Sequence, residues 1–162
     1  MSKRVVNRKG DIYCVNISNQ YKVYFQYVAD DMTQLNSSVI RVFKTRHQSE
    51  SSPTIEEIIN DSIDFYAHAM INIGLKQGLW SKIGSSKDMG NIDNIGFKML
   101  DSPKDTSWYV WTINSPIEYH ANLPSQYSHY DWGWVYASIN IVKRIKDGCY
   151  YVIEEERKVD RR

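Results

Sequence analysis

The sequence has little of what marks a secreted or membrane-bound protein. Its 162 residues include two cysteines, and Cys14 and Cys149 form no C-x-x-C pair. We therefore expect two reduced thiols rather than a disulfide framework. No apolar run is long enough to cross a bilayer, and the basic N-terminus lacks the apolar stretch of a secretory signal. These absences predict a protein of the bacterial cytoplasm that has no membrane partner.

An excess of charge of one sign is also missing. The chain has 20 Lys and Arg residues against 19 Asp and Glu residues, a formal net charge of +1. Such a balance gives no overall field that would draw the chain onto nucleic acid, so we do not expect nucleic acid as a partner. A chain of this length forms one ordinary domain. We expect a single domain over residues 1–162, with an ordered core at about 9–150 and a charged C-terminal tail at 154–162.

Runs of alternating residues rich in Val, Ile, Tyr and Phe predict several β-strands. Residues 9–17 and 21–28 give the first two, and the short polar segment between them predicts a β-hairpin near the N-terminus. The other expected strands are residues 39–44, 63–71, 97–100 and 108–113.

Two segments have the apolar spacing and the end signals of short helices. Residues 53–60 carry a stripe of isoleucines, with Ser52 expected as the N-cap and Pro53 at the first helical position. Residues 139–147 carry a similar stripe, and Gly148 stands where a C-terminal cap belongs.

Between these elements we expect a tight helical turn at residues 74–80 and a long irregular loop at 114–130. Many alternating strands against only two convincing helical stripes predict the α+β class. The expected architecture is a strongly bent, mostly antiparallel sheet with SH3-like barrel character and short packing helices.

No set of nucleophile, base and orienting group in the sequence announces a reaction, and we expect no cofactor. The best metal-like pattern sets Glu118 and His120 against His129 and Asp131. Its spacing is not a recognised ligand code, and ordinary hydrogen bonding within a loop explains the same residues. Whether His120 and His129 bind a metal stays open. His68 is a candidate general base, but a half-buried, hydrogen-bonded strand histidine is the favoured interpretation.

The second half of the chain is unusually aromatic. Tryptophan and tyrosine anchor protein interfaces when they stay partly exposed, and they also stack on sugars or bases. The alternative is a core built from aromatic rings. Trp108 and Trp111 fall on opposite faces of one expected strand, so one of them remains available to a partner unless both faces are covered. The other aromatic residues of this half include Tyr127, Tyr130, Trp132, Trp134 and Tyr136.

Four short motifs together resemble the immunity protein 26 family of bacterial polymorphic toxin systems. They are Gly-Asp-Ile-Tyr at residues 10–13, Gly-Leu-Trp-Ser-Lys-Ile-Gly at 78–84, Phe-Lys-Met-Leu-Asp at 97–101 and Val-Lys-Arg-Ile at 142–145. Each motif is weak alone, and their order and spacing carry the resemblance. The resemblance implies a protein that neutralises a cognate toxin domain by binding it, with no catalysis of its own.

If this implication holds, the face for the toxin is expected in the loop at residues 114–134, because loops tolerate the variation that partner choice demands. The expected partner-binding residues are Glu118, Tyr119, Tyr127, Tyr130, Asp131 and Trp132. Two alternatives stay open. The opening at residues 8–12 is similar to that of PemK/MazF-type endoribonuclease toxins, although the Arg-Pro loop that follows there is missing here. The aromatic second half also suits a module that binds a carbohydrate or small ligand.

Overall fold

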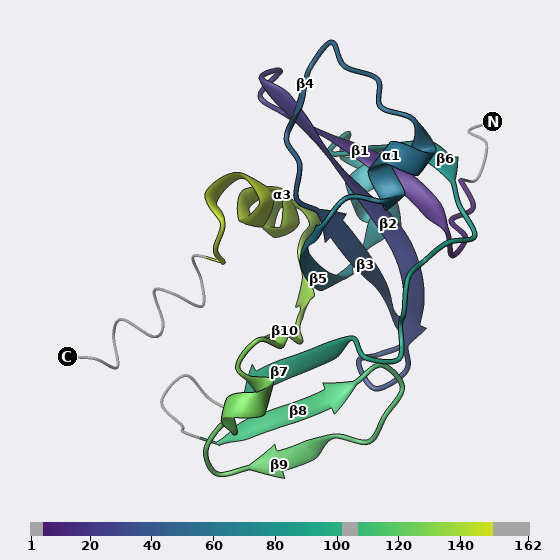
Figure 1. The fold of residues 1–162 in the computed structure, drawn as a ribbon. Helices are drawn as coiled ribbons and strands as arrows, with labels where there is room; N and C mark the ends of the chain where they lie inside the picture. Colours follow the sequence, from purple (N-terminus) through teal and green to yellow (C-terminus); the bar gives the residue numbers. More distant parts are fainter. Residues whose placement is uncertain (1–4, 102–106, 151–162) are drawn as a thin grey trace.

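A computed structural model describes residues 5–101 and 107–150, which form two β-sheets and a few short helices (Figure 1). Within these residues the first sheet has seven strands in the order β11-β5-β3-β2-β1-β6, with β4 paired to β2, and the second has the order β10-β7-β8-β9. The predicted α+β class with a bent antiparallel sheet and short helices is confirmed. Neither sheet closes into a barrel in the described part of the chain.

The bounds of the elements follow the predicted strands closely in the first half of the chain. The first sheet comprises β1 (Asp11–Ile17), β2 (Tyr21–Asp31), β3 (Ser37–Phe43), β4 (His47–Gln48), β5 (Ile63–Ala69), β6 (Ser81–Ser85) and β11 (Val135–Tyr136). The second comprises β7 (Gly96–Leu100), β8 (Trp108–Thr112), β9 (Glu118–His120) and β10 (Asp131–Trp132). The helices are α1 (Ile55–Ile59), α2 (Ile71–Lys76), α3 (Ser138–Asp147) and the 3-10 turn η1 (Ser125–Tyr127).

The predicted N-terminal hairpin is confirmed. β1 and β2 pair antiparallel, with Ile17 opposite Tyr21. Ser18 and Asn19 both have positive φ angles, 51° and 56°, and reverse the chain between the strands. Two successive left-handed residues match the right-handed twist of paired strands, which is why a short polar segment suffices here. β3 then pairs antiparallel with β2, and β5 with β3.

A β-bulge in β2 carries that strand from one hydrophobic core to another. The register against β3 shifts between Tyr27 and Ala29. Phe25 and Tyr27 pack in the main core with residues of β1, β5 and α3. Val28 and Ala29 both pack in a second cluster with Phe97, between the two sheets. The bulge thereby lets one long strand hold the second sheet against the first.

The helix ends show which local signals were interpreted correctly. α3 ends at Gly148, whose φ of 77° confirms the predicted C-cap. The predicted N-cap of the first helix is wrong, because Thr54 caps α1 in place of Ser52. The Thr54 side chain accepts from the Glu57 N–H, and the Glu57 side chain accepts from the Thr54 N–H. This reciprocal pair satisfies two backbone donors, which a serine two residues earlier cannot do.

The region of the expected turn at 74–80 also differs from the prediction. α2 begins at Ile71, directly after β5, and ends before the turn at Gly78, whose φ is 70°. Gly74 lies against the ring of Trp80, where an added Cβ would approach the indole to 2.0 Å. The short distance explains a glycine inside a helix, since a larger residue would push Trp80 out of the main core.

The prediction that either Trp108 or Trp111 is available to a partner is wrong. Their exposed fractions are 8% and 3%. Trp111 packs between the sheets near Phe97, and the ring of Trp108 lies 5.7 Å from that of Trp132 on the other side of β8. Both faces of this strand are covered.

Cys14 and Cys149 are free thiols, which confirms the expectation from their spacing. In the ranges 5–101 and 107–150, no helix has the length and apolar character to cross a membrane. The expected charged tail at 154–162 lies outside the described residues.

Candidate functional site

The segment at residues 114–130 contains a strand, β9, where an irregular loop was expected. β9 pairs antiparallel with β8 at the edge of the second sheet. Because alternate residues of a strand share a face, Glu118 and His120 project from one face of the sheet and Tyr119 from the other. The pairing therefore divides the predicted partner-binding residues between two faces.

Tyr127 and Tyr130 cover the Glu118 side of the second sheet and line a small cavity there. Their ring centroids are 5.1 Å apart. The Glu118 Oε2 atom accepts a hydrogen bond from the Tyr127 hydroxyl at 3.4 Å and lies 3.2 Å from His120 Nε2. The cavity has a volume of about 260 Å³. We call it the tyrosine pocket; its lining includes Val110, Thr112, Pro116, Glu118, Tyr127 and Tyr130.

β7 positions the two tyrosines. Gly96 lies directly beneath the ring of Tyr130, and an added Cβ there would approach that ring to 2.2 Å. Lys98, two residues along the same strand, donates from Nζ to the Ser128 carbonyl at 2.6 Å. Both contacts fix the segment around η1 against the sheet. A missing side chain at Gly96 is therefore what lets the wall of the pocket sit close to the strand.

A buried carboxylate that the sequence did not single out fixes the opposite wall. Asp31, at the end of β2, lies 2.8 Å from His68 Nε2 and accepts from Trp111 Nε1 at 2.9 Å. Its other oxygen accepts from the Asn114 N–H at 3.1 Å and from the Thr33 N–H at 3.1 Å. Asp31 therefore ties β2 and β5 of the first sheet to β8 and to the loop that follows β8.

The electrostatics of Asp31 are those of a buried carboxylate stabilised by several hydrogen-bond donors. Burial alone would raise the pKa of Asp31, but hydrogen bonds from His68, Trp111 and the Asn114 N–H outweigh burial and hold it at about 2. The carboxylate is ionised, so His68 Nε2 must carry the proton that joins them. His68 was expected to be half-buried; it is completely buried, with an exposed fraction of 0%. It has a structural partner and no access to a substrate.

The β2–β3 turn extends the same network toward the tyrosine pocket. The Met32 N–H donates to Asn114 Oδ1 at 2.7 Å, and Thr33 Oγ1 donates to the Ser115 carbonyl at 2.8 Å. Ser115 also lines the pocket. Met32 and Leu35, in the turn itself, are 74% and 89% exposed. The β2–β3 turn thus fixes the segment at Asn114 and Ser115, which borders the pocket, and carries two exposed apolar side chains.

Tyr119 lies apart from the pocket. It is 60% exposed, its hydroxyl lies 2.9 Å from Ser107 Oγ, and its ring meets Tyr109 edge-on at 5.8 Å. An exposed tyrosine whose ring is held by a neighbour remains a suitable anchor for a partner. It can join the pocket residues in one interface only if the partner wraps the β9 edge.

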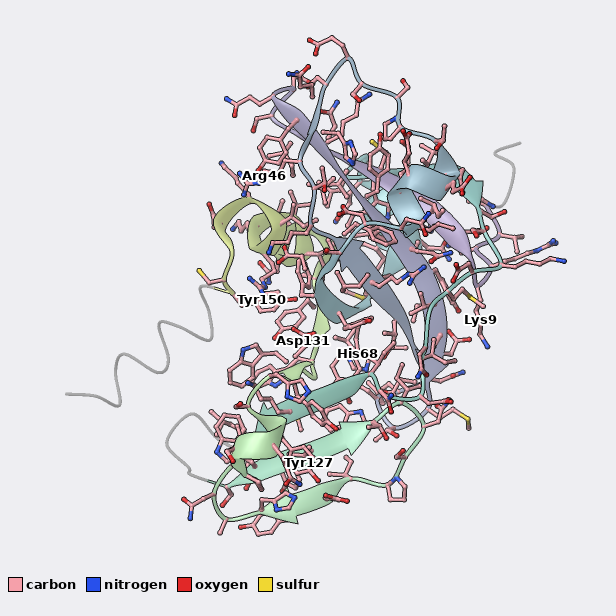
Figure 2. All side chains as sticks on the ribbon, in the orientation of Figure 1. Lys9, Arg46, His68, Tyr127, Asp131 and Tyr150 are labelled. Carbon is pink, nitrogen blue, oxygen red and sulfur yellow. The ribbon has the colours of Figure 1, made fainter. Side chains whose placement is uncertain are left out.

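Asp131 and Trp132 lie between the sheets and the pocket, and both are half-buried. Asp131 Oδ2 accepts from the Tyr66 N–H of β5 at 2.9 Å, and burial raises the pKa of Asp131 to about 6. Trp132 stacks near Trp108, with Lys98 Nζ 5.4 Å from its ring. Figure 2 shows Asp131 and His68 where the two sheets approach each other. These positions serve the junction of the sheets, and their role toward a partner stays a prediction.

The metal-like pattern does not assemble in the described residues. Glu118 and His120 are close, but His129 packs its ring against Tyr130 at 5.0 Å and Asp131 bonds to β5. No group of three or more His, Cys, Asp or Glu side chains within 5–101 and 107–150 is placed to hold a metal ion.

A comparison with protein families gives one match. A family model described as immunity protein 26 matches residues 8–100, more than half of the chain. The matched range includes β1 to β7 and leaves β8 to β11, α3 and the tyrosine pocket outside. No match was found among the curated proteins or among the solved structures.

Proposed function

The chain belongs to the immunity protein 26 family, and from this we propose that it binds one cognate toxin and neutralises it by binding alone, in the bacterial cytoplasm. The observation that carries the proposal is the family match across β1 to β7. The proposal assigns no reaction to the chain. His68, the residue with the best intrinsic chemistry for a general base, is committed to Asp31 in the interior.

We place the toxin-binding face on the tyrosine pocket and the β9 edge, with Glu118, Tyr127, Tyr130 and Tyr119 as contacts. Two features of these residues support this. The tyrosines are partly exposed and held by a sheet, and tyrosine is enriched at protein interfaces, while Glu118 offers charge complementarity to a basic partner. They also lie beyond Leu100, where the family match ends. Members of one family that bind different toxins must differ in sequence at their binding faces. A segment outside the shared scaffold, such as the one after Leu100, can carry these sequence differences.

Asp131 and Trp132 belong to the proposal in a supporting role. Their contacts with Tyr66 and Trp108 hold the second sheet beside the first. Alanine at either position, which removes these contacts, is expected to disturb the fold first and binding as a consequence. In this proposal the two sheets form one domain that presents the toxin-binding face at its second sheet.

The test starts from the toxin encoded beside this chain. Co-expression measures protection, and calorimetry on the purified pair measures affinity. Alanine substitutions at Tyr127 and Tyr130 are expected to weaken binding at least tenfold, since buried aromatic anchors carry most of the energy of an interface. Glu50→Ala, at an exposed position in the loop after β4, is the control and should leave binding unchanged. Folding of each variant is checked by circular dichroism.

Two results would contradict the proposal. Failure of the wild-type chain to bind or protect against the neighbouring toxin would remove the toxin-neutralising role. Cleavage of RNA by the purified chain would favour the endoribonuclease interpretation instead. Unchanged affinity in both tyrosine variants would leave the role intact and move the face elsewhere.

A further inference from the structure

The tyrosine pocket has an unusual lining for its size. Glu118 is the one charged residue among its lining residues, and it is a carboxylate whose side chain is 60% exposed. The remaining walls are aromatic rings, aliphatic carbons and hydroxyls. A volume of about 260 Å³ is below the roughly 300–1,000 Å³ of typical small-molecule sites. The pocket therefore suits one protruding side chain better than a sugar or a nucleotide.

The chemistry of the walls specifies a cation. The rings of Tyr127 and Tyr130 lie 5.1 Å apart at an angle of 42°, and both line the cavity. The face of an aromatic ring attracts a positive charge, and a neighbouring carboxylate adds a direct ionic hydrogen bond. Glu118 lines the same cavity, within hydrogen-bond reach of the Tyr127 hydroxyl and of His120 Nε2.

Among cationic side chains, arginine fits this arrangement best. A guanidinium group is flat and weakly hydrated, stacks on tyrosine rings and presents parallel N–H groups to a carboxylate. A lysine ammonium is compact and strongly hydrated, and it gains less from two ring faces. We propose that the tyrosine pocket receives an arginine side chain of the cognate toxin, paired with Glu118 and stacked on Tyr127 and Tyr130. This inference rests on the proposed function.

The pocket is also firmly preformed. Gly96 and Lys98 hold the tyrosine side, and the Asp31 network holds the loop at Asn114 and Ser115. A site that is ordered before binding loses less conformational entropy when the arginine enters. Glu118→Gln keeps the shape of a side chain that is 60% exposed, so we expect it to remove the charge and leave the fold intact.

The experiment measures the affinity of the toxin for the wild-type chain and for Glu118→Gln, with Glu50→Gln as the control that removes the same charge elsewhere. Glu118→Gln should raise Kd roughly ten- to hundredfold, the worth of one charge-assisted hydrogen bond, and Glu50→Gln should leave it unchanged. Tyr127→Leu should raise Kd roughly three- to thirtyfold, while Tyr127→Phe, which keeps the ring, stays within about threefold of wild type.

A double-mutant cycle then identifies the occupant. Each surface arginine of the toxin is changed to alanine and measured against both the wild-type chain and Glu118→Gln. One arginine should matter against the wild type and lose most of its effect against Glu118→Gln. Absence of any such arginine would overturn the proposal, as would a Glu118→Gln variant that binds as tightly as wild type.

Two further outcomes separate the pocket from the function it serves. If the wild-type chain fails to bind the toxin, the proposed function fails and the pocket has no toxin to serve. If sedimentation shows a wild-type dimer that Glu118→Gln dissociates, the occupant of the pocket is a second copy of this chain. That result would refute the proposal that an arginine of the toxin enters the pocket, whereas the co-expression assay alone decides whether the chain protects against the toxin.

Discussion

Replacing Asp31 by alanine is expected to destabilise the fold strongly while leaving its surface intact. Asp31 has an exposed fraction of 0% and accepts hydrogen bonds from His68, Trp111, Thr33 and Asn114. Removing the carboxylate leaves the buried His68 Nε2–H without an acceptor, and the loss of one hydrogen bond to a charged group costs about 1.5–3 kcal/mol. The backbone N–H groups of Thr33 and Asn114 and the indole N–H of Trp111 would also lose their acceptor, which adds to the loss of stability.

The pKa of Asp31 gives a second, independent magnitude. An aspartate with a pKa of about 2 in the native state, against an ordinary value of 3.8, contributes roughly 2 kcal/mol of stability at neutral pH. Because the native pKa is the lower one, this contribution is fully present above about pH 4 and is lost as the pH falls toward 2. The wild type should therefore lose stability over that acid range more steeply than an Asp31 variant does.

Urea unfolding followed by tryptophan fluorescence and circular dichroism provides the assay. With a urea dependence of roughly 2 kcal/mol per molar, Asp31→Ala should lower the midpoint by about 2 M at pH 7. Asp93→Asn removes one negative charge from an exposed position and should shift the midpoint by less than about 0.3 M. An Asp31→Ala midpoint within about 0.5 M of wild type would refute the view that this carboxylate joins the sheets.

Three further changes test other parts of the structure. Burial raises the pKa of Asp131 to about 6, above its ordinary value of 3.8. The free energy of unfolding of the wild type should therefore fall as the pH rises from about 4 to 6. Asp131→Asn should remove this fall and be roughly 1–3 kcal/mol more stable than wild type in urea at pH 8, with no such gain at pH 4. Gly74→Ala should lower thermal stability by roughly 1–3 kcal/mol despite the better helix propensity of alanine, because its Cβ meets the Trp80 ring; an unchanged melting temperature would mean that Trp80 can move aside. Leu35→Asn should raise the free energy of unfolding by about 1 kcal/mol and with it the melting temperature, since asparagine tolerates the φ of 52° found there. A lower melting temperature would contradict that reasoning.

The elements that the sequence predicts well are those whose signals are local. Alternation over β1, β2, β3 and β5 is visible in consecutive residues, and so is the helical stripe that ends at Gly148. Local signals fail where two candidates compete within a few positions. Ser52 and Thr54 are both acceptable N-caps in isolation, and the reach of the Glu57 side chain decides for Thr54.

The candidate site was predictable only in part, for reasons of distance along the chain. Glu118, Tyr127 and Tyr130 could be proposed because they are close in sequence and of suitable type. That Tyr119 leaves their face depends on the pairing of β9 with β8, which the sequence of a short, proline-flanked segment does not display. The burial of Asp131 depends on Tyr66, a contact that no pattern near Asp131 announces.

Asp31 was missed for the same reason. In the sequence it is the second of two aspartates at the polar end of a strand, where a solvated turn is the ordinary interpretation. Its partners come from two distant parts of the chain, His68 from β5, and Trp111 and Asn114 from β8 and the turn that follows it. A buried carboxylate of this kind becomes visible only when the bulge in β2 and the placement of the second sheet are known.

The two late strands β10 and β11 each pair in parallel with a strand from much earlier in the chain, and this has a consequence for synthesis. β11 pairs with β5 through Val135 and His68, and β10 pairs with β7 through Asp131 and Phe97. A ribosome releases these late strands only after their partners have emerged, and contacts between distant parts of a chain form slowly. A nascent chain that has reached Leu100 therefore contains the whole family-matched range with both sheets still unfinished. Under the proposed function, protection in a cell that makes the toxin at the same time begins only after these last strands have left the ribosome, so slower translation of the segment after Leu100 would delay protection.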